Sequence, residues 1–147
     1  MQIQILALFT TLLAVTQAAP AAGKLDARNW VNDCGDSTFV NQSSGGSPLI
    51  ADCQQIVRNI AGGGTWTVSV VKSHRQLVSY GTCVFGVDGD GGGLFVHVGN
   101  GDISDLINDS IKRFAWQGKV GAKGHMQCQN IDGGITYAGL NWGLYHT

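Results

Sequence analysis

Residues 76–118 read QLVSYGTCVFGVDGDGGGLFVHVGNGDISDLINDSIKRFAWQG and carry the signals that decide the fold. Apolar residues on both faces predict a strand over about residues 76–87, and alternation predicts another over residues 94–98. The glycine-rich connection at residues 88–93 predicts that these two strands form an antiparallel hairpin. A helix signal starts soon afterwards at Asp102, so the stretch predicts strands that pack against a helix.

Two helices are predicted, one before and one within this stretch. The second runs from Asp102 as N-cap to about Phe114, and its apolar residues recur at helical spacing at Ile103, Leu106, Ile107 and Ile111. The first starts with Ser47 as N-cap and Pro48 in the first turn, and it ends at the glycines of residues 62–64. Its apolar spacing predicts that Cys53 lies on the buried face.

The rest of the chain adds strand signals on both sides of this stretch. Strands are predicted over residues 34–40, 65–71, 119–128 and 135–145, with a loop at residues 41–46 and a turn at residues 132–134. Two helices among neighbouring strands fit a mainly antiparallel sheet with two helices packed on it. The predicted class is therefore α+β, in a small single domain with two disulfides.

The N-terminal residues predict export from the cell. Residues 3–15 are almost entirely apolar, and the small residues Ala18 and Ala19 predict signal-peptide cleavage after Ala18. This apolar run is shorter than the roughly 18 residues that a membrane-spanning helix needs. We therefore expect a signal peptide over residues 1–18, a tether over residues 19–33 that adds little to the fold, and a secreted domain over residues 34–147.

Four cysteines lie in the expected mature domain, at Cys34, Cys53, Cys83 and Cys128. An even number of cysteines in a secreted chain predicts two disulfides, and the sequence leaves all three pairings open. A zinc site is the alternative. However, no CxxC pair is present, and the separations of 19, 30 and 45 residues are unlike those of paired zinc ligands.

The charge balance argues against several partners. Nine lysines and arginines oppose ten acidic residues, all of them aspartate, which leaves a formal net charge of −1. We therefore expect no basic surface for nucleic acid or for an anionic membrane, and no stable membrane insertion.

No set of residues predicts catalysis or a cofactor. Residues 88–99 begin like a calcium loop, but Gly92 and Gly99 occupy positions that need oxygen ligands. Strand signals follow these glycines where a phosphate cradle would need a helix. A serine-hydrolase motif is absent from the sequence, bridged cysteines cannot serve as nucleophiles, and no aspartate pair stands out for glycoside hydrolysis. The histidines lie on separate predicted elements and are interpreted as ordinary surface or sheet-face residues: His74, His97, His125 and His146.

Aromatic faces can stack on sugars, so the aromatic residues that follow raise a carbohydrate-binding hypothesis: Trp30, Trp66, Trp116, Trp142, Tyr137 and Tyr145. Trp66 and Trp142 lie on predicted strands where their rings could stack on sugars, and a place in the core is the alternative. Glycosylation sequons begin at Asn41, in a predicted loop, and at Asn108, in a predicted helix. The loop position makes Asn41 the better expected acceptor.

Short blocks around the cysteines resemble a known family. The blocks are Cys34-Gly35-Asp36-Ser37-Thr38-Phe39, Ala51-Asp52-Cys53, Tyr80-Gly81-Thr82-Cys83-Val84-Phe85, Gly118-Lys119-Val120-Gly121, Met126-Gln127-Cys128 and Trp142-Gly143-Leu144-Tyr145. In order and spacing, from about Asn32 to the C-terminus, they are similar to the fungal Ecp-two effector domain, also called the necrosis-inducing effector family. The stretch Asn100-Gly101-Asp102 resembles the family's loop into the second helix.

This resemblance implies a protein secreted by a fungus, with relatives that provoke cell death or recognition in plants. Some members join the domain to chitinase-like or chitin-binding modules, as in killer toxins. The resemblance carries over no catalytic residues, only the cysteines as structural bridges. We therefore predict a non-enzymatic effector or toxin-like protein that binds a target protein or cell-surface component of a host plant or a competing microbe. A secreted chitin- or glucan-binding protein is the alternative, and a hydrolase is a third hypothesis.

Overall fold

A computed structural model describes residues 29–71, 73–91, 95–131 and 136–147. The predictions for residues 1–28, which cover the signal peptide and most of the tether, lie outside these ranges. Parts of the two glycine-rich connections, residues 92–94 and 132–135, also lie outside them. Among the helices that are described, none is long and apolar enough to span a bilayer.

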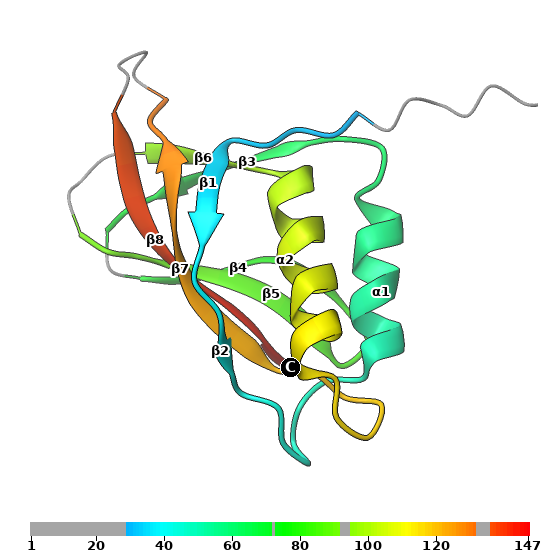
Figure 1. Ribbon diagram of the computed structural model, residues 1–147. Coiled ribbons are helices and arrows are strands. Elements are labelled where there is room, and N and C mark those ends of the chain that lie inside the picture. The colour runs from blue at the N-terminus through cyan, green and yellow to red at the C-terminus, as the bar shows by residue number, and fades with distance from the viewer. Residues whose placement is uncertain (1–28, 72, 92–94, 132–135) are drawn as a thin grey trace, which may run out of the picture.

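Within the described ranges, two helices and eight strands confirm the predicted α+β class (Figure 1). The helices are α1 (Ile50–Asn59) and α2 (Asn100–Phe114). The strands are β1 (Cys34–Ser37), β2 (Val40–Asn41), β3 (Thr65–Ser69), β4 (His74–Tyr80), β5 (Cys83–Gly89), β6 (Phe95–Gly99), β7 (Ala122–Gln129) and β8 (Tyr137–His146).

The strands form two antiparallel sheets. The main sheet has the order β1-β7-β8-β5-β4, and β2 pairs with β7 beyond the end of β1. The smaller sheet consists of β3 and β6. Figure 1 shows α1 and α2 side by side on one side of the main sheet, so one face of that sheet is covered and the other faces away from the helices.

The hydrophobic core fills the space between the helices and the covered face of the main sheet. Core residues that are no more than 2% exposed include Cys53, Ile56, Phe85, Ile103, Ile107, Met126, Leu140, Trp142 and Leu144. The predicted buried position of Cys53 on α1 is therefore confirmed.

The strand predicted over residues 76–87 is interrupted by a tight turn. β4 and β5 pair as a hairpin that turns at Gly81, whose φ of 54° favours glycine. The Asp52 carboxylate of α1 holds the turn, because it accepts hydrogen bonds from the N–H (2.8 Å) and the hydroxyl (2.7 Å) of Thr82. The same two bonds lower the pKa of Asp52 below its usual value.

The predicted hairpin between residues 76–87 and 94–98 is wrong. One edge of β5 is paired with β4 and the other with β8, so neither edge is left for β6. β6 pairs with β3 instead, in a register that runs from Thr65 opposite Gly99 to Ser69 opposite Phe95. A strand has only two hydrogen-bonding edges. The turn signal in residues 88–93 does not show that both edges of β5 are already paired with other strands.

The first helix begins later than predicted. Its N-cap is Leu49, and Ser47 lies in the preceding loop. There the Ser47 hydroxyl accepts the Ser44 N–H at 2.9 Å and donates to the Gln42 carbonyl at 3.2 Å, so it orders the loop and does not cap the helix.

The second helix begins earlier than predicted. Its N-cap is Gly99, so Asp102 is inside the first turn. The Asp102 carboxylate nevertheless accepts the Gly99 N–H at 2.8 Å, which is the backward half of a capping box. Asp102 therefore takes part in capping α2, as expected. The N-cap position itself is Gly99, three residues earlier.

The expectation that the tether adds little to the fold is wrong for its last residues. The Val31 N–H donates to the Asn100 side chain, and the Val31 carbonyl accepts the Gly101 N–H, both at 2.9 Å. The Asp33 carbonyl accepts the Gln129 N–H, also at 2.9 Å. This segment therefore bonds to both α2 and β7.

Gly99 lies where this segment crosses the start of α2. A Cβ added there would lie 2.0 Å from the Val31 carbonyl oxygen. Gly99→Ala is therefore expected to lower the free energy of unfolding by about 2 kcal/mol, as overpacking does, in a urea titration. Gly62→Ala is the matched control, because its Cβ would meet no atom within 4 Å. Equal effects of the two changes would contradict this account.

Candidate functional site

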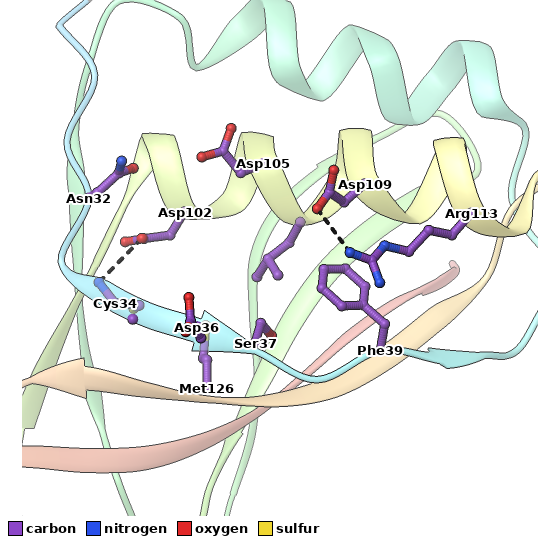
Figure 2. A pocket seen from close by; sticks show the side chains of 12 residues that line it. Asn32, Cys34, Asp36, Ser37, Phe39, Asp102, Asp105, Asp109, Arg113 and Met126 are labelled. Carbon is purple, nitrogen blue, oxygen red and sulfur yellow. Dashed lines mark hydrogen bonds and ion pairs between the residues drawn. The ribbon is translucent and has the colours of Figure 1, made fainter.

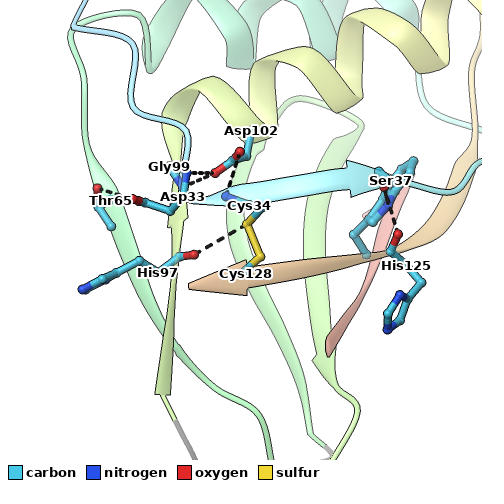
Figure 3. Close-up of a disulfide and its surroundings, with 10 residues drawn as sticks. Asp33, Cys34, Ser37, Thr65, His97, Gly99, Asp102, His125 and Cys128 are labelled. Carbon is cyan, nitrogen blue, oxygen red and sulfur yellow. Dashed lines mark hydrogen bonds between the residues drawn. A yellow bond between two sulfur atoms is a disulfide. The ribbon is translucent and has the colours of Figure 1, made fainter. Parts of the chain in front are cut away.

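Two disulfides brace the surfaces that could bind a ligand. Cys34–Cys128 joins β1 to β7, and Cys53–Cys83 joins α1 to β5, so the two predicted bridges are confirmed and their pairing is defined. All four cysteines lie in the described ranges, and none of them is free to act as a nucleophile. Figure 3 shows the Cys34–Cys128 bridge next to the first turn of α2.

Asp102 attaches the N-terminal segment to α2 (Figure 3). Its carboxylate accepts the backbone N–H groups of Gly99, Asp33 and Cys34 at 2.8, 2.9 and 3.2 Å. The residue is 8% exposed, and its pKa is raised, first by burial and also by the charge of Asp33, although the three N–H donors act to lower it. A buried carboxylate that is bonded to three N–H groups has a structural role and is not available to a ligand.

A groove of about 560 Å³ runs between β1 and α2, and we call it the α2 groove (Figure 2). Its walls include Asp36, Ser37, Phe39, Asp105, Asp109 and Arg113. Burial and the neighbouring charge of Asp109 raise the pKa of Asp105, against a hydrogen bond from Trp30 that lowers it. The Arg113 guanidinium lies 3.6 Å from the Asp109 carboxylate and 4.3 Å from the centre of the Phe39 ring.

These side chains give the α2 groove an acidic wall with one cation at its end. In the described ranges, no group of three His, Cys, Asp or Glu side chains is placed to hold a metal ion. Of the aspartates that line the groove, Asp109 is paired with Arg113 and Asp102 with backbone N–H groups, whereas Asp36 and Asp105 are exposed. The groove therefore suits a basic or hydroxyl-bearing partner.

The uncovered face of the main sheet carries a second polar surface. The strand registers place His74 opposite Asp88, Asp88 opposite Asn141, and Asn141 opposite His125. Opposed residues of antiparallel strands point to the same face, so these four residues form one row across β4, β5, β8 and β7. Leu140, next to Asn141 in β8, is fully buried, which places the row on the side away from the core.

A hollow of about 590 Å³ lies along this row, and we call it the sheet face. Its walls include His74, Gly86, Asp88, Lys123, His125, Asn141, Gly143 and Tyr145. His125 also lies 3.6 Å from the Asp90 carboxylate, so each histidine of the row has an aspartate beside it.

A short chain of polar contacts orders one end of the sheet face. The Asp88 carboxylate lies 3.3 Å from His74 Nδ1, and His74 Nε2 lies 2.5 Å from the Tyr145 hydroxyl. A proton on Nδ1 directed at Asp88 leaves Nε2 as the acceptor for the Tyr145 O–H. Burial, and then the negative charge of Asp88, raise the pKa of Tyr145. The phenol therefore remains protonated at neutral pH and acts as a hydrogen-bond donor.

Gly86 makes room for this contact. A Cβ at Gly86 would lie 2.7 Å from the Tyr145 hydroxyl and 2.8 Å from the His74 ring. Gly143 lies directly opposite Gly86 on the next strand, and a Cβ there would lie 3.5 Å from Tyr145 Cδ1. The Tyr145 ring therefore extends over a floor of two glycines.

Asp88→Asn is expected to lower the pKa of Tyr145 toward its ordinary value of 10.0, because the change removes a negative charge that disfavours the tyrosinate. Ultraviolet titration of the phenol measures this, with Tyr145→Phe as the subtraction control for the other tyrosines. A raised folded pKa also means that the contribution of Tyr145 to stability is present below about 10 and is lost as the pH rises through the folded pKa. An unchanged Tyr145 titration in Asp88→Asn would contradict the contact.

The two tryptophans predicted to stack on a ligand have different surroundings. Trp142 is 2% exposed, its ring stacks on Phe85 with centroids 6.1 Å apart, and its indole N–H donates to the Ser37 hydroxyl at 2.6 Å. The alternative of a core residue is therefore correct for Trp142, and its ring is not open to a sugar. Trp66 is half-buried and packs against the core, so its stacking role stays a prediction.

The interpretation of the histidines as surface or sheet-face residues is confirmed for two of them, which lie on the same face of the main sheet. His74 and His125 are 51 positions apart in the sequence and share the row on the sheet face. His97 lies on β6 of the smaller sheet, and His146 lies at the end of β8. Strand alternation was visible in the sequence, but the register between strands, which aligns the row, was not.

Both sequon asparagines are exposed. Asn41 ends β2, and its side-chain oxygen accepts the Ser43 N–H at 2.8 Å, whereas Asn108 lies on α2. Exposure makes both reachable, and their glycosylation stays a prediction.

Two helices on one side of an antiparallel sheet, two disulfides and two surface hollows define a small disulfide-bonded α+β protein. Residues 33–128 match the Hce2 family, which is described as "Pathogen effector; putative necrosis-inducing factor". The chain belongs to this family, and the resemblance seen in the sequence is confirmed.

Two curated proteins of Penicillium expansum are similar to the chain. "Probable chitinase LysM18" is 36% identical over 118 residues, which cover 78% of this chain and 8% of the relative. "Secreted chitinase LysM12" is 37% identical over 114 residues, which cover 75% of this chain and 7% of the relative. The chain therefore spans less than a tenth of the length of these two relatives.

Proposed function

We propose that this protein is a secreted effector or toxin-like protein that binds a protein or cell-surface component of a host plant or a competing microbe, without catalysing a reaction. The observation that carries the proposal is the match to the pathogen-effector family over residues 33–128, a segment that contains all four bridged cysteines. Export to an oxidising compartment agrees with two disulfides and with a relative named as secreted.

The geometry supports binding as the mode of action. The α2 groove and the sheet face are both large enough for part of a ligand, and the Cys34–Cys128 bridge joins a strand of the first to a strand of the second. In the described part of the chain, the cysteines are bridged, and two of the aspartates of the α2 groove, Asp102 and Asp109, are bonded to structural partners. A braced surface of this kind binds with little loss of conformational entropy.

Infiltration of the purified, disulfide-bonded protein into leaves tests the plant-directed form of the proposal, and growth inhibition of other fungi and of bacteria tests the microbe-directed form. Reduced and alkylated protein is the control, because it has the same sequence without the bridges. Cell death or growth inhibition that requires the oxidised protein would support the proposal. Equal effects of oxidised and reduced protein, or no effect in either assay, would count against it.

A secreted chitin- or glucan-binding protein is the second candidate. The observation that favours it is the pair of relatives named as chitinases, in which the segment similar to this chain makes up 7 to 8% of the length. Retention of the protein on insoluble chitin or glucan, compared with retention of its reduced form, tests this candidate.

A further inference from the structure

The Tyr145 ring on the sheet face is fixed from several sides. Its hydroxyl bonds to His74 Nε2 at 2.5 Å, and the His74 ring meets it edge-on with centroids 5.2 Å apart. Asp88 holds the other nitrogen of His74 at 3.3 Å. A Cβ at Gly86 would lie 2.7 Å from the Tyr145 hydroxyl, so the glycine at this position lets the ring lie close to the sheet. The sheet face therefore has an aromatic ring whose orientation is set before a ligand arrives.

Hydrogen-bonding groups of both kinds surround this ring. Asp88 offers acceptors, Lys123 offers donors, and Asn141 and His125 offer both. The side chains of His74 and Asp88 are 52% and 50% exposed, so they keep bonding capacity toward solvent. The rim combines the carboxylates of Asp88 and Asp90 with the ammonium group of Lys123, so charged groups of both signs lie along it. A neutral ligand with many hydroxyl groups matches such a rim better than an anion or a cation does.

The end of the sheet face that lies toward β2 carries one exposed apolar side chain, Val40. The registers place Val40 opposite Lys123 and Lys123 opposite Gly143, so these residues continue the floor toward the edge of the sheet. Val40 is 48% exposed. An apolar side chain next to an ammonium group fits an acetamido substituent, whose methyl needs an apolar contact and whose carbonyl needs a donor.

We propose that the sheet face binds a chain of β-linked N-acetylglucosamine, with one sugar ring stacked on Tyr145 and its hydroxyl groups bonded to Asp88, Asn141 and His125. The acetamido group of the next sugar lies over Val40 and Lys123. This inference rests on the proposed binding function and names its ligand and its site. It also places the sugar-binding surface at Tyr145, which is half-buried, and not at Trp142, which is buried.

Titration of N-acetylchitohexaose into the disulfide-bonded protein tests the site by calorimetry. Wild-type protein is expected to bind, and Tyr145→Ala is expected to weaken binding about tenfold through loss of the stacking surface. Tyr145→Phe keeps the ring and loses only the bond to His74, so its loss should be smaller. Tyr80→Ala is the matched control, because Tyr80 is 48% exposed and does not line the sheet face.

Amide chemical shifts give a readout that needs no variant. Addition of the hexasaccharide should shift the amide signals of Gly86, Asn141 and Gly143 and leave those of the α2 groove, such as Asp105, unchanged. Binding that Tyr145→Ala does not weaken, shifts confined to the α2 groove, or equal binding of laminarihexaose would each overturn the assignment. If wild-type protein kills leaf cells but does not bind the hexasaccharide, this inference is contradicted and the proposed function remains supported. If the protein binds the hexasaccharide but is inactive in both biological assays, the sugar site is supported and the proposed effector function is contradicted.

Discussion

Removal of the Cys34–Cys128 bridge is expected to lower the free energy of unfolding by about 4 to 5 kcal/mol. The bridge joins residues that are 94 positions apart, and a link across so long a loop strongly restricts the unfolded chain. The Cys34→Ala/Cys128→Ala variant should therefore lose roughly 15 to 20 °C of melting temperature. Calorimetry of the wild-type and variant proteins at the same pH measures the difference.

The second bridge provides the comparison for this result. Cys53 and Cys83 are 30 positions apart, so the same reasoning expects an entropic loss of about 3.5 kcal/mol for Cys53→Ala/Cys83→Ala. Both of these cysteines are fully buried, and the lost sulfur atoms add a packing cost that the loop length does not describe. An unchanged melting temperature for the Cys34/Cys128 variant would show that loop closure does not stabilise this fold.

The fold class could be predicted because it depends on local patterns. The apolar spacing of α2 and the buried position of Cys53 on α1 each follow from a helical period within about four turns. The even number of cysteines predicted two bridges in the same way. None of these signals requires knowledge of which segments meet in space. The pairing of the cysteines does require it, and the sequence left that pairing open.

Strand partners could not be predicted because they depend on competition for edges. Residues 88–93 look like a hairpin connection, yet β5 is already paired on both sides by β4 and β8. The turn at Gly81 was hidden by apolar residues on both of its arms, and the Asp52 side chain that holds it comes from α1. The signal that could have revealed this turn was Gly81, a glycine inside an apolar strand pattern.

The sheet face could not be predicted for a related reason. Its row takes one residue from each of four strands, and a shift of one position in any register would turn that residue toward the core. The tryptophan hypothesis failed at Trp142 because alternation shows which residues share a face and not which face is covered by helices. Tyr145 lies on the opposite face of the same strand, three positions later.

Asp102→Ala is expected to lower the free energy of unfolding by about 3 kcal/mol, a large effect for the loss of one side chain from a helix. The substitution removes one carboxylate and leaves the N–H groups of Gly99, Asp33 and Cys34 without their acceptor. Because Asp102 is only 8% exposed, water replaces those bonds poorly. Urea denaturation measures the loss, and hydrogen exchange at the Asp33 and Cys34 amides should become faster.

Asp109→Ala separates this effect from the general loss of a negative charge on α2. Asp109 lies two helical turns further along, its side chain is 49% exposed, and its partner Arg113 is 3.6 Å away. An exposed pair of this kind contributes less than about 1 kcal/mol, so the control should change stability little. If the two substitutions cost the same, the three N–H bonds do not hold the N-terminal segment. If only Asp102→Ala is costly, that carboxylate, together with the Cys34–Cys128 bridge, positions the strand that forms one wall of the α2 groove.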